Sequence, residues 1–222
     1  MAKIGLVIFD CDGVLIDSEI LSAETLIDLL AGYDVAVDLD YVRRHFLGRS
    51  FPTVAATLRG NFNLDLPVDF ERVYRRRLLE VFARGLKPTP GVIEMLSQLT
   101  TPFCVATSSS PERATRSLEI AGLTRFFGDR LYTASEVARG KPAPDLFLHA
   151  ADCECVAPEN CLIVEDSLPG LEAADSAGMT AFHYVGGSHM TGTEAWTGGH
   201  SPGRVVFDNW REFADRLAAL TR

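Results

Sequence analysis

The sequence has no long apolar run. The longest one near the start, residues 4–9, is interrupted by Gly5 and is far too short for the hydrophobic region of a signal peptide or for a membrane span. Internal repeats are also absent. A content of 47% hydrophobic and 23% charged residues is typical of globular domains. We therefore expect a cytoplasmic protein with no membrane partner, in which 222 residues form one domain with an insert or two small domains.

Positive charge is in deficit. The chain carries 21 Lys and Arg against 30 Asp and Glu, for a formal net charge of −9. This balance opposes broad electrostatic attraction to nucleic acid or to an anionic membrane surface. We therefore expect no nucleic-acid partner, and any anionic ligand must be held by local groups.

Cysteine is scarce and odd in number, which favours reduced thiols over a disulfide framework. The cysteines are Cys11, Cys104, Cys153, Cys155 and Cys161. The last three are close in sequence, but no second Cys pair or nearby His completes a zinc site. The histidines also lack the spacing of a metal site, and we interpret all of them as structural: His45, His149, His183, His189 and His200.

Three short apolar runs each end in a polar residue, as buried strands do at the edge of a sheet. They cover residues 3–9, 103–106 and 162–164. Helical spacing follows them, at residues 111–121, 144–151 and 168–177. Alternating strands and helices predict an α/β fold with a Rossmann-like parallel sheet. Ligands bind such sheets at the carboxyl ends of the strands.

The segment after the first strand has a different pattern. Residues 18–31, 41–46, 52–60 and 67–84 have helical spacing, with no convincing strand between them. Turn-forming residues at 17–18 and 85–91 suggest hinges at both exits. We predict an all-helical cap domain at residues 17–87, inserted into a catalytic core made of residues 1–16 and 88–222. For a capped protein of this size we expect a monomer.

Two carboxylates follow the first strand in the segment Asp-Cys-Asp-Gly-Val, residues 10–14. Asp10 and Asp12 can converge on one small cation where the backbone leaves the sheet, and Gly13 permits a tight turn there. Taken alone, this pattern is more often an ordinary surface turn. Its interpretation therefore depends on the segments that follow the other strands.

The second strand leads into Thr107, Ser108, Ser109 and Ser110. Their hydroxyl groups, together with the free N–H groups of the helix that follows, favour an anion such as phosphate. The alternative is a serine N-cap before Pro111. Capping and anion binding are compatible, so both interpretations stay open.

A lysine and two further acids complete the set of candidates. Lys141 lies between Gly140 and Pro142, which restrict the backbone, although a solvated surface lysine is the simpler alternative. Glu165 and Asp166 follow the third apolar strand. Together with Asp10 and Asp12, these acids would form an oxygen-rich site suited to Mg²⁺.

These four segments, in this order, resemble the haloacid dehalogenase superfamily over residues 4–185. Within it, the chain is similar to the phosphatases with a helical cap and to the β-phosphoglucomutase-like subgroup. The resemblance implies that Asp10 forms an aspartyl phosphate and that Asp12 is the general acid and base. It implies that Thr107, Ser108 and Lys141 hold the phosphoryl group. We also expect proximity to Asp10 and burial by the closed cap to raise the pKa of Asp12.

The resemblance also implies a magnesium cofactor. Asp10, Asp166 and the backbone carbonyl of Asp12 would bind Mg²⁺, with Glu165 nearby. The predicted function is a magnesium-dependent phosphohydrolase acting on a small phosphorylated metabolite. Sugar phosphates, sugar-acid phosphates and phosphoglycolate all fit. Glu19, Arg49 and Ser50 on the cap are candidate substrate contacts, whereas residues 75–77, all arginines, are more typical of a solvated helix face.

Single residues distinguish the predicted phosphohydrolase from the other activities of related proteins. Dehalogenases of this family carry another residue at the position of Asp12, and phosphonate-cleaving relatives use a cap lysine, which residues 17–86 lack. Hexose-phosphate mutases carry a histidine where this chain has Ser22, so hydrolysis is favoured over a sugar phosphomutase. A phospho-accepting signalling module needs neither Asp12 nor a helical lid. The last two activities remain the alternatives.

Overall fold

The centre of the computed structural model is a six-stranded parallel sheet. The structure describes residues 4–46, 49, 51–190 and 204–220. The strands are β1 (Leu6–Phe9), β2 (Phe103–Thr107), β3 (Leu131–Thr133), β4 (Cys161–Glu165), β5 (Thr180–Tyr184) and β6 (Val205–Phe207). The predicted α/β fold is therefore confirmed. The three strands predicted from the sequence are β1, β2 and β4, and the other three were not predicted.

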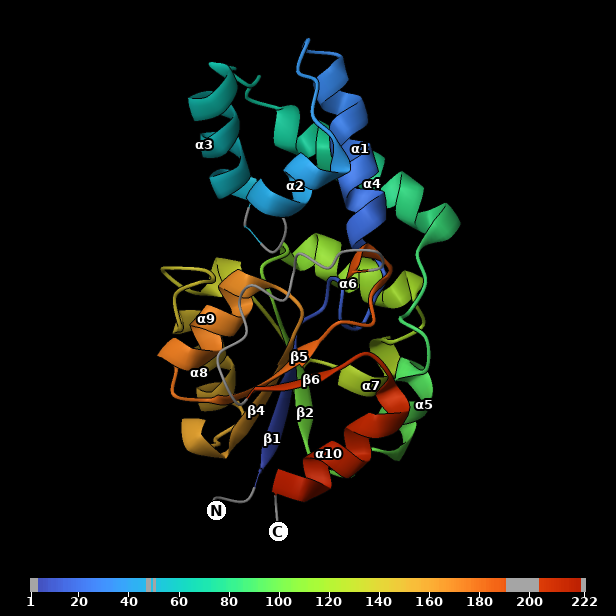
Figure 1. The fold of residues 1–222 in the computed structure, drawn as a ribbon, viewed down its shortest axis with the longest axis vertical. Coiled ribbons are helices and arrows are strands. Elements are labelled where there is room, and N and C mark those ends of the chain that lie inside the picture. Colours follow the sequence, from blue (N-terminus) through green and yellow to red (C-terminus); the bar gives the residue numbers. More distant parts are fainter. Residues whose placement is uncertain (1–3, 47–48, 50, 191–203, 221–222) are drawn as a thin grey trace.

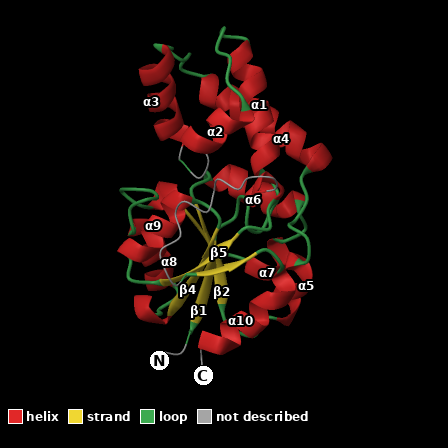
Figure 2. Cartoon of the chain, in the orientation of Figure 1, coloured by secondary structure: helices red, strands yellow, loops and turns green. Residues whose placement is uncertain are grey.

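Helices cover both faces of this sheet (Figure 2). They are α5 (Val92–Gln98), α6 (Pro111–Ile120), α7 (Thr124–Phe127), α8 (Asp145–Cys153), α9 (Leu168–Ser176) and α10 (Phe213–Leu220). Successive residues of β1 point to opposite faces. Phe9 belongs to one buried cluster with Phe213 of α10, whereas Ile8 belongs to another with Phe147 of α8. No helix among the described residues has the length and apolarity needed to cross a bilayer.

Strand β1 lies in the middle of the sheet, whose order is β3-β2-β1-β4-β5-β6. The chain adds β2 and β3 on one side of β1, then crosses over and adds β4, β5 and β6 on the other. Such a reversal is where parallel sheets bind ligands, outside the carboxyl ends of the strands. The topology therefore brings the residues that follow β1, β2 and β4 to one place.

Four of the helices between β1 and β2 lie beyond the carboxyl ends of the strands (Figure 1). They are α1 (Glu19–Ala31), α2 (Leu39–His45), α3 (Phe51–Phe62) and α4 (Phe70–Gly85), so the predicted helical insert is confirmed. The two connecting segments run side by side, because Asp17 N donates to Lys87 O at 2.9 Å and Ile16 bridges to Pro88. We keep residues 17–87 as the predicted limits of the cap.

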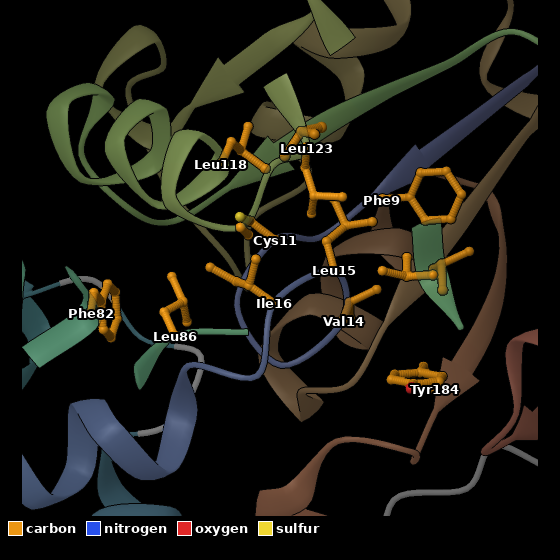
Figure 3. Close-up of a cluster of buried hydrophobic side chains, with 14 of the residues drawn as sticks. Phe9, Cys11, Val14, Leu15, Ile16, Phe82, Leu86, Leu118, Leu123 and Tyr184 are labelled. Carbon is orange, nitrogen blue, oxygen red and sulfur yellow. The ribbon is translucent and has the colours of Figure 1, made fainter. Parts of the chain in front are cut away.

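The loop after β1 is fixed by apolar packing on its inner side (Figure 3). Phe9, Cys11 and Ile16 belong to the same buried cluster as Phe82 and Leu86 at the end of the cap. Close-packed interiors resist displacement of their members. The loop that carries the two aspartates is therefore held by the core of the sheet and by the base of the cap together.

Candidate active site

The turn after β1 comes close to the end of β4. Asp10 is buried at the end of the strand, and Gly13 has a φ of +82°. A Cβ atom at Gly13 would lie 2.1 Å from Asp166 Oδ2, so only glycine suits both this backbone conformation and this close approach. The turn thereby places Asp10 and Asp166 in one site.

Lys141 lies at the centre of the site, with its side chain 1% exposed. Its Nζ donates to Asp10 Oδ1 at 2.5 Å, to Glu165 Oε1 at 2.6 Å and to the carbonyl of Ala106 at 3.2 Å. Burial alone would lower the pKa of Lys141, but the carboxylates of Asp10 and Glu165 raise it above its ordinary value. The solvated-lysine alternative is therefore wrong, and Lys141 is a buried cation.

Glu165 holds this lysine in place. Its second oxygen accepts hydrogen bonds from the backbone N and the Oγ of Ser167, at 2.7 and 2.9 Å. Ser167 also caps α9 by accepting from Gly170 N. With both oxygens engaged by protein donors, the Glu165 carboxylate is oriented toward Lys141.

Asp10, Glu165 and Asp166 each offer an oxygen within 4.8 Å of the others, in a fully buried group. Burial raises the pKa of Asp10 and of Asp166 well above the ordinary value, and the neighbouring acids add to this. Gathered carboxylates need positive charge, which Lys141 supplies only in part. A hard divalent cation such as Mg²⁺ prefers oxygen ligands of this kind, so the residues present fit a metal site.

Asp12 lies beside this cluster and is surrounded by hydrogen-bond donors. Its Oδ1 accepts from Ser18 Oγ at 2.6 Å and from Arg113 Nη2 at 2.7 Å, and its Oδ2 accepts from Ser109 Oγ at 2.6 Å. Burial would raise the pKa of Asp12, but the Arg113 guanidinium and the two hydroxyls outweigh it and lower the pKa below its ordinary value. The expectation of a raised pKa for Asp12 is therefore wrong in this structure.

The hydroxyl-rich segment after β2 serves partly as a helix cap. Ser110 is the N-cap of α6, and its side chain accepts from Arg113 N at 3.4 Å, which confirms the capping interpretation. Thr107 is buried, and its Oγ1 accepts from Ser109 N at 3.1 Å. Ser108 faces the same cavity as Lys141. Phosphate binding by Thr107 and Ser108 stays a prediction.

A cavity that is open to solvent lies between the carboxyl ends of the strands and the cap. The core contributes the acids, Lys141 and the hydroxyl segment, and the cap contributes Glu19, Ser22, Ala23, Leu26, Val42, Phe46, Arg49, Phe51, Val54, Tyr74 and Arg75. Two of the three predicted substrate contacts, Glu19 and Arg49, therefore line the cavity, whereas Ser50 lies outside the described residues. Arg75 lines it too, although its neighbourhood in sequence suggested a solvated face.

Two residues near the site were missed in the sequence. Arg113 carries no motif that marks it. His189 was interpreted as structural, but it is buried with its Nε2 2.9 Å from Asp166 Oδ2. Gly187 was a signal for it, because a Cβ there would lie 2.6 Å from the His189 ring. The preceding residue, Ser188, donates from its backbone N and its Oγ to Asp17 Oδ1, at 3.0 and 2.8 Å. These hydrogen bonds connect the segment that carries His189 to the hinge.

Comparison with known proteins gives consistent results. Residues 4–178 match the family described as haloacid dehalogenase-like hydrolase. The chain is 29% identical to the 6-phosphogluconate phosphatase of Escherichia coli K12, over 85% of this chain and 86% of that protein. It is 31% identical to the phosphorylated carbohydrates phosphatase of Thermotoga maritima, over 81% and 84%. A haloacid dehalogenase-like protein of unknown function from Agrobacterium tumefaciens superposes with a TM-score of 0.82 at 30% identity, over 99% of this chain and 100% of that one.

Proposed function

This chain belongs to the haloacid dehalogenase-like hydrolase family, and on that premise we propose that it is a phosphatase that hydrolyses small phosphorylated carbohydrates through an aspartyl phosphate on Asp10. The observation that carries the proposal is the buried contact of Lys141 with Asp10 and Glu165. An anionic nucleophile can approach a phosphate group only where positive charge offsets the repulsion. Lys141 supplies such charge at the nucleophile itself.

Asp10 and Asp166, with the backbone carbonyl of Asp12, would hold the metal ion. When bound, Mg²⁺ supplies further charge neutralisation for the phosphate and the carboxylates. Glu165 was predicted as a ligand as well. Because both of its oxygens already accept hydrogen bonds from Lys141 and Ser167, we assign it the orientation of Lys141.

The reaction then needs two proton transfers. An oxygen of Asp10 attacks phosphorus, the bond to the leaving oxygen breaks, and that oxygen takes a proton from Asp12. Water next attacks the phosphorus of phosphorylated Asp10, the bond between phosphorus and the Asp10 oxygen breaks, and the water proton goes back to Asp12. Inorganic phosphate is released and Asp10 is a carboxylate again. Thr107 and Ser108 would hold the phosphoryl oxygens during both steps.

The cap cavity would take the part of the substrate beyond the phosphate. The two curated relatives compared above are phosphatases of 6-phosphogluconate and of phosphorylated carbohydrates, and this supports a sugar-phosphate or sugar-acid phosphate substrate. Glu19, Arg49 and Ser50 are proposed contacts. A mutase is disfavoured because Ser22, which accepts from Arg113 at 3.2 Å, has no group suited to acid–base work.

Phosphate release from a panel of sugar, sugar-acid and glycolate phosphates tests this proposal, with Mg²⁺ and with a chelator. We expect turnover that requires Mg²⁺ and falls by at least about 10³-fold in Asp10→Asn. Asp152→Asn, an exposed aspartate on α8, is the matched control and should behave as wild type. Conversion of a sugar phosphate to its isomer without phosphate release would instead establish the mutase.

A thermal-unfolding assay tests the metal site without activity. Mg²⁺ should raise the unfolding temperature of wild type, because a ligand bound only by the folded state stabilises it, and should have less effect on Asp166→Asn. Equal stabilisation of both proteins would contradict the assigned ligands. Size-exclusion chromatography of the same preparation checks the predicted monomer.

A further inference from the structure

Arg113 connects the catalytic loop to the cap. It lies in the first turn of α6, and its Nη2 donates to Asp12 Oδ1 at 2.7 Å and to Ser22 Oγ of α1 at 3.2 Å. Its guanidinium carbon lies 5.6 Å from the centre of the Phe82 ring on α4. One side chain from the core therefore contacts Asp12 and two helices of the cap.

The orientation of Asp12 depends on this side chain more than on its other partners. Ser18 and Ser109 also donate to the carboxylate, but they do so through rotatable hydroxyl groups. Arg113 alone brings a positive charge, on a planar group held by a further hydrogen bond to Ser22, and a hydrogen bond from a charged donor to a carboxylate is stronger than one from a neutral hydroxyl. It therefore holds Asp12 as a carboxylate pointing into the cavity that both residues line.

Stability does not account for this arrangement. Buried ion pairs often contribute no more to stability than apolar residues of the same volume, because both charges lose their hydration. Arg113 Nε is buried and has no hydrogen-bond partner among the described residues, so the guanidinium is incompletely satisfied. Its placement favours Asp12 at the expense of its own hydrogen bonding.

We propose that Arg113 is a positioning residue that directs the Asp12 carboxylate at the water attacking phosphorylated Asp10. This inference rests on the proposed phosphohydrolase function. In the step concerned, the water oxygen bonds to phosphorus, the bond between phosphorus and the Asp10 oxygen breaks, and the water proton goes to Asp12. Inorganic phosphate then leaves and Asp10 is a carboxylate again. Loss of Arg113 slows this step more than it slows the first phosphoryl transfer.

Stopped-flow kinetics with p-nitrophenyl phosphate and Mg²⁺ separates the two steps, because an aryl leaving group departs without needing a proton. For Arg113→Met we expect a burst of about one p-nitrophenol per active site, at a rate within about threefold of wild type. The steady-state rate that follows should fall by about 30-fold or more, since positioned acid–base groups contribute about 10²-fold to 10⁴-fold. Arg113→Lys should recover part of the loss.

Arg116→Met is the matched control. Arg116 lies one turn further along α6, is exposed and pairs with Glu119, so this variant should retain the kinetics of wild type. An equal fall in the burst and steady-state rates of Arg113→Met would overturn the proposal, because a structural or substrate-binding role slows both steps alike. An unchanged steady-state rate would overturn it as well.

A double variant keeps the test decisive if Arg113→Met alone does not fold. Asp12→Asn with Arg113→Met removes both charges together. If Arg113 acts through Asp12, the second substitution should change the steady-state rate of Asp12→Asn by less than about twofold. A larger further fall would overturn the proposal, because Arg113 would then act independently of Asp12.

The two proposals fail in different ways. Absence of any p-nitrophenol release that depends on Asp10 in the wild-type protein would defeat the proposed function. A wild type that turns over and is inactivated by Asp10→Asn, with additive effects of Arg113 and Asp12, would defeat only the role of Arg113.

Discussion

A buried cation, Lys141, and a partly buried one, Arg113, flank the turn after β1, and they differ in what else they contact. Lys141 contacts Asp10, Glu165 and a carbonyl of β2, all within the core. Arg113 contacts Asp12 but also reaches the cap at Ser22. The side chain of Lys141 is 1% exposed and that of Arg113 is 18% exposed. In the proposed reaction, stabilisation of phosphoryl charge by Lys141 would therefore belong to the core, whereas proton transfer by Asp12 would take place where the cap can influence it.

Loss of Lys141 and loss of Arg113 should also differ in their cost to stability. Removing one partner of a buried pair leaves the other charge uncompensated, at a cost of about 3–5 kcal/mol. Lys141 compensates two carboxylates and Arg113 compensates one. The pKa of Asp10 is raised by burial even with Lys141 in contact, whereas the pKa of Asp12 is lowered because Arg113 and two hydroxyls outweigh burial. The pKa values of the two aspartates, two residues apart, are thus shifted in opposite directions. A lowered pKa suits Asp12 as the acceptor of the water proton in the second step, whereas a nucleophile must be ionised, and the charge of Lys141 favours that form of Asp10.

The largest loss of activity is expected from Lys141→Met, which tests whether Lys141 and Arg113 have separate roles. Lys141 acts on charge at the phosphoryl group, so its loss should lower kcat/KM by about 10³-fold, for an alkyl ester and for p-nitrophenyl phosphate alike. Steady-state assays on both esters measure this. Lys87→Met, at an exposed lysine of the hinge, is the control. A loss confined to one ester would mean that Lys141 serves the leaving group and that the two cations do not have separate roles.

An intermediate effect is expected from Gly170→Ala in α9. A Cβ at this position would lie 1.7 Å from Glu165 Oε1, so the carboxylate that orients Lys141 must move. Overpacking of this kind costs about 1–3 kcal/mol of unfolding free energy, and kcat/KM should fall for both esters. Chemical denaturation and the same assays check it. Gly85→Ala is the control, because a Cβ at this exposed end of α4 would meet no atom within 4 Å. It should lower neither the unfolding free energy nor kcat/KM, and an equal loss in the two variants would contradict the argument.

The two centres also differ in how well the sequence predicted them. Lys141 could be predicted because Gly140 and Pro142 flank it and because acids follow the neighbouring strands. Arg113 could not be predicted, since its partner Asp12 is 101 residues away and nothing in the sequence distinguishes it from Arg116 on the same helix. Contacts over this sequence separation are set by the parallel pairing of β1 with β2 in the sheet, and local spacing in the sequence does not reveal them.

The same reasoning explains the outcome for the fold. Strands β1, β2 and β4 are buried over nearly their whole length, so they read as continuous apolar runs. Strands β3 and β6 have three residues each, too few for a pattern. The helices of the cap were found because each buries only one side, which leaves a clear helical period. The pKa of Asp12 was predicted in the wrong direction, because burial and the proximity of Asp10 were weighed without the Arg113 guanidinium and the two hydroxyl groups that contact Asp12.

The smallest expected effect is on stability, and it comes from Glu19 on helix α1 of the cap. Burial, with the negative charges of Asp12 and Asp166, raises its pKa to about 8, although His189 and Arg113 act in the opposite direction. Between the ordinary value of 4.5 and about pH 8, the folded protein therefore binds more protons at Glu19 than the unfolded chain does. Stability contributed by this group is present below pH 4.5 and is lost as the pH rises toward 8.

Glu19→Gln removes the ionisable group, and with it the loss of stability between pH 4.5 and 8. In the presence of a chelator, its unfolding free energy relative to wild type should be higher at pH 8 than at pH 5.5, by roughly 1–2 kcal/mol. Denaturant titrations at the two pH values measure the difference, and Glu24→Gln, an exposed glutamate on the same helix, should show none. A difference that does not change with pH would mean that Glu19 is ionised at both values. The cap would then add a fixed negative charge beside Asp12, and the Arg113 guanidinium would have to compensate two acids, as Lys141 does.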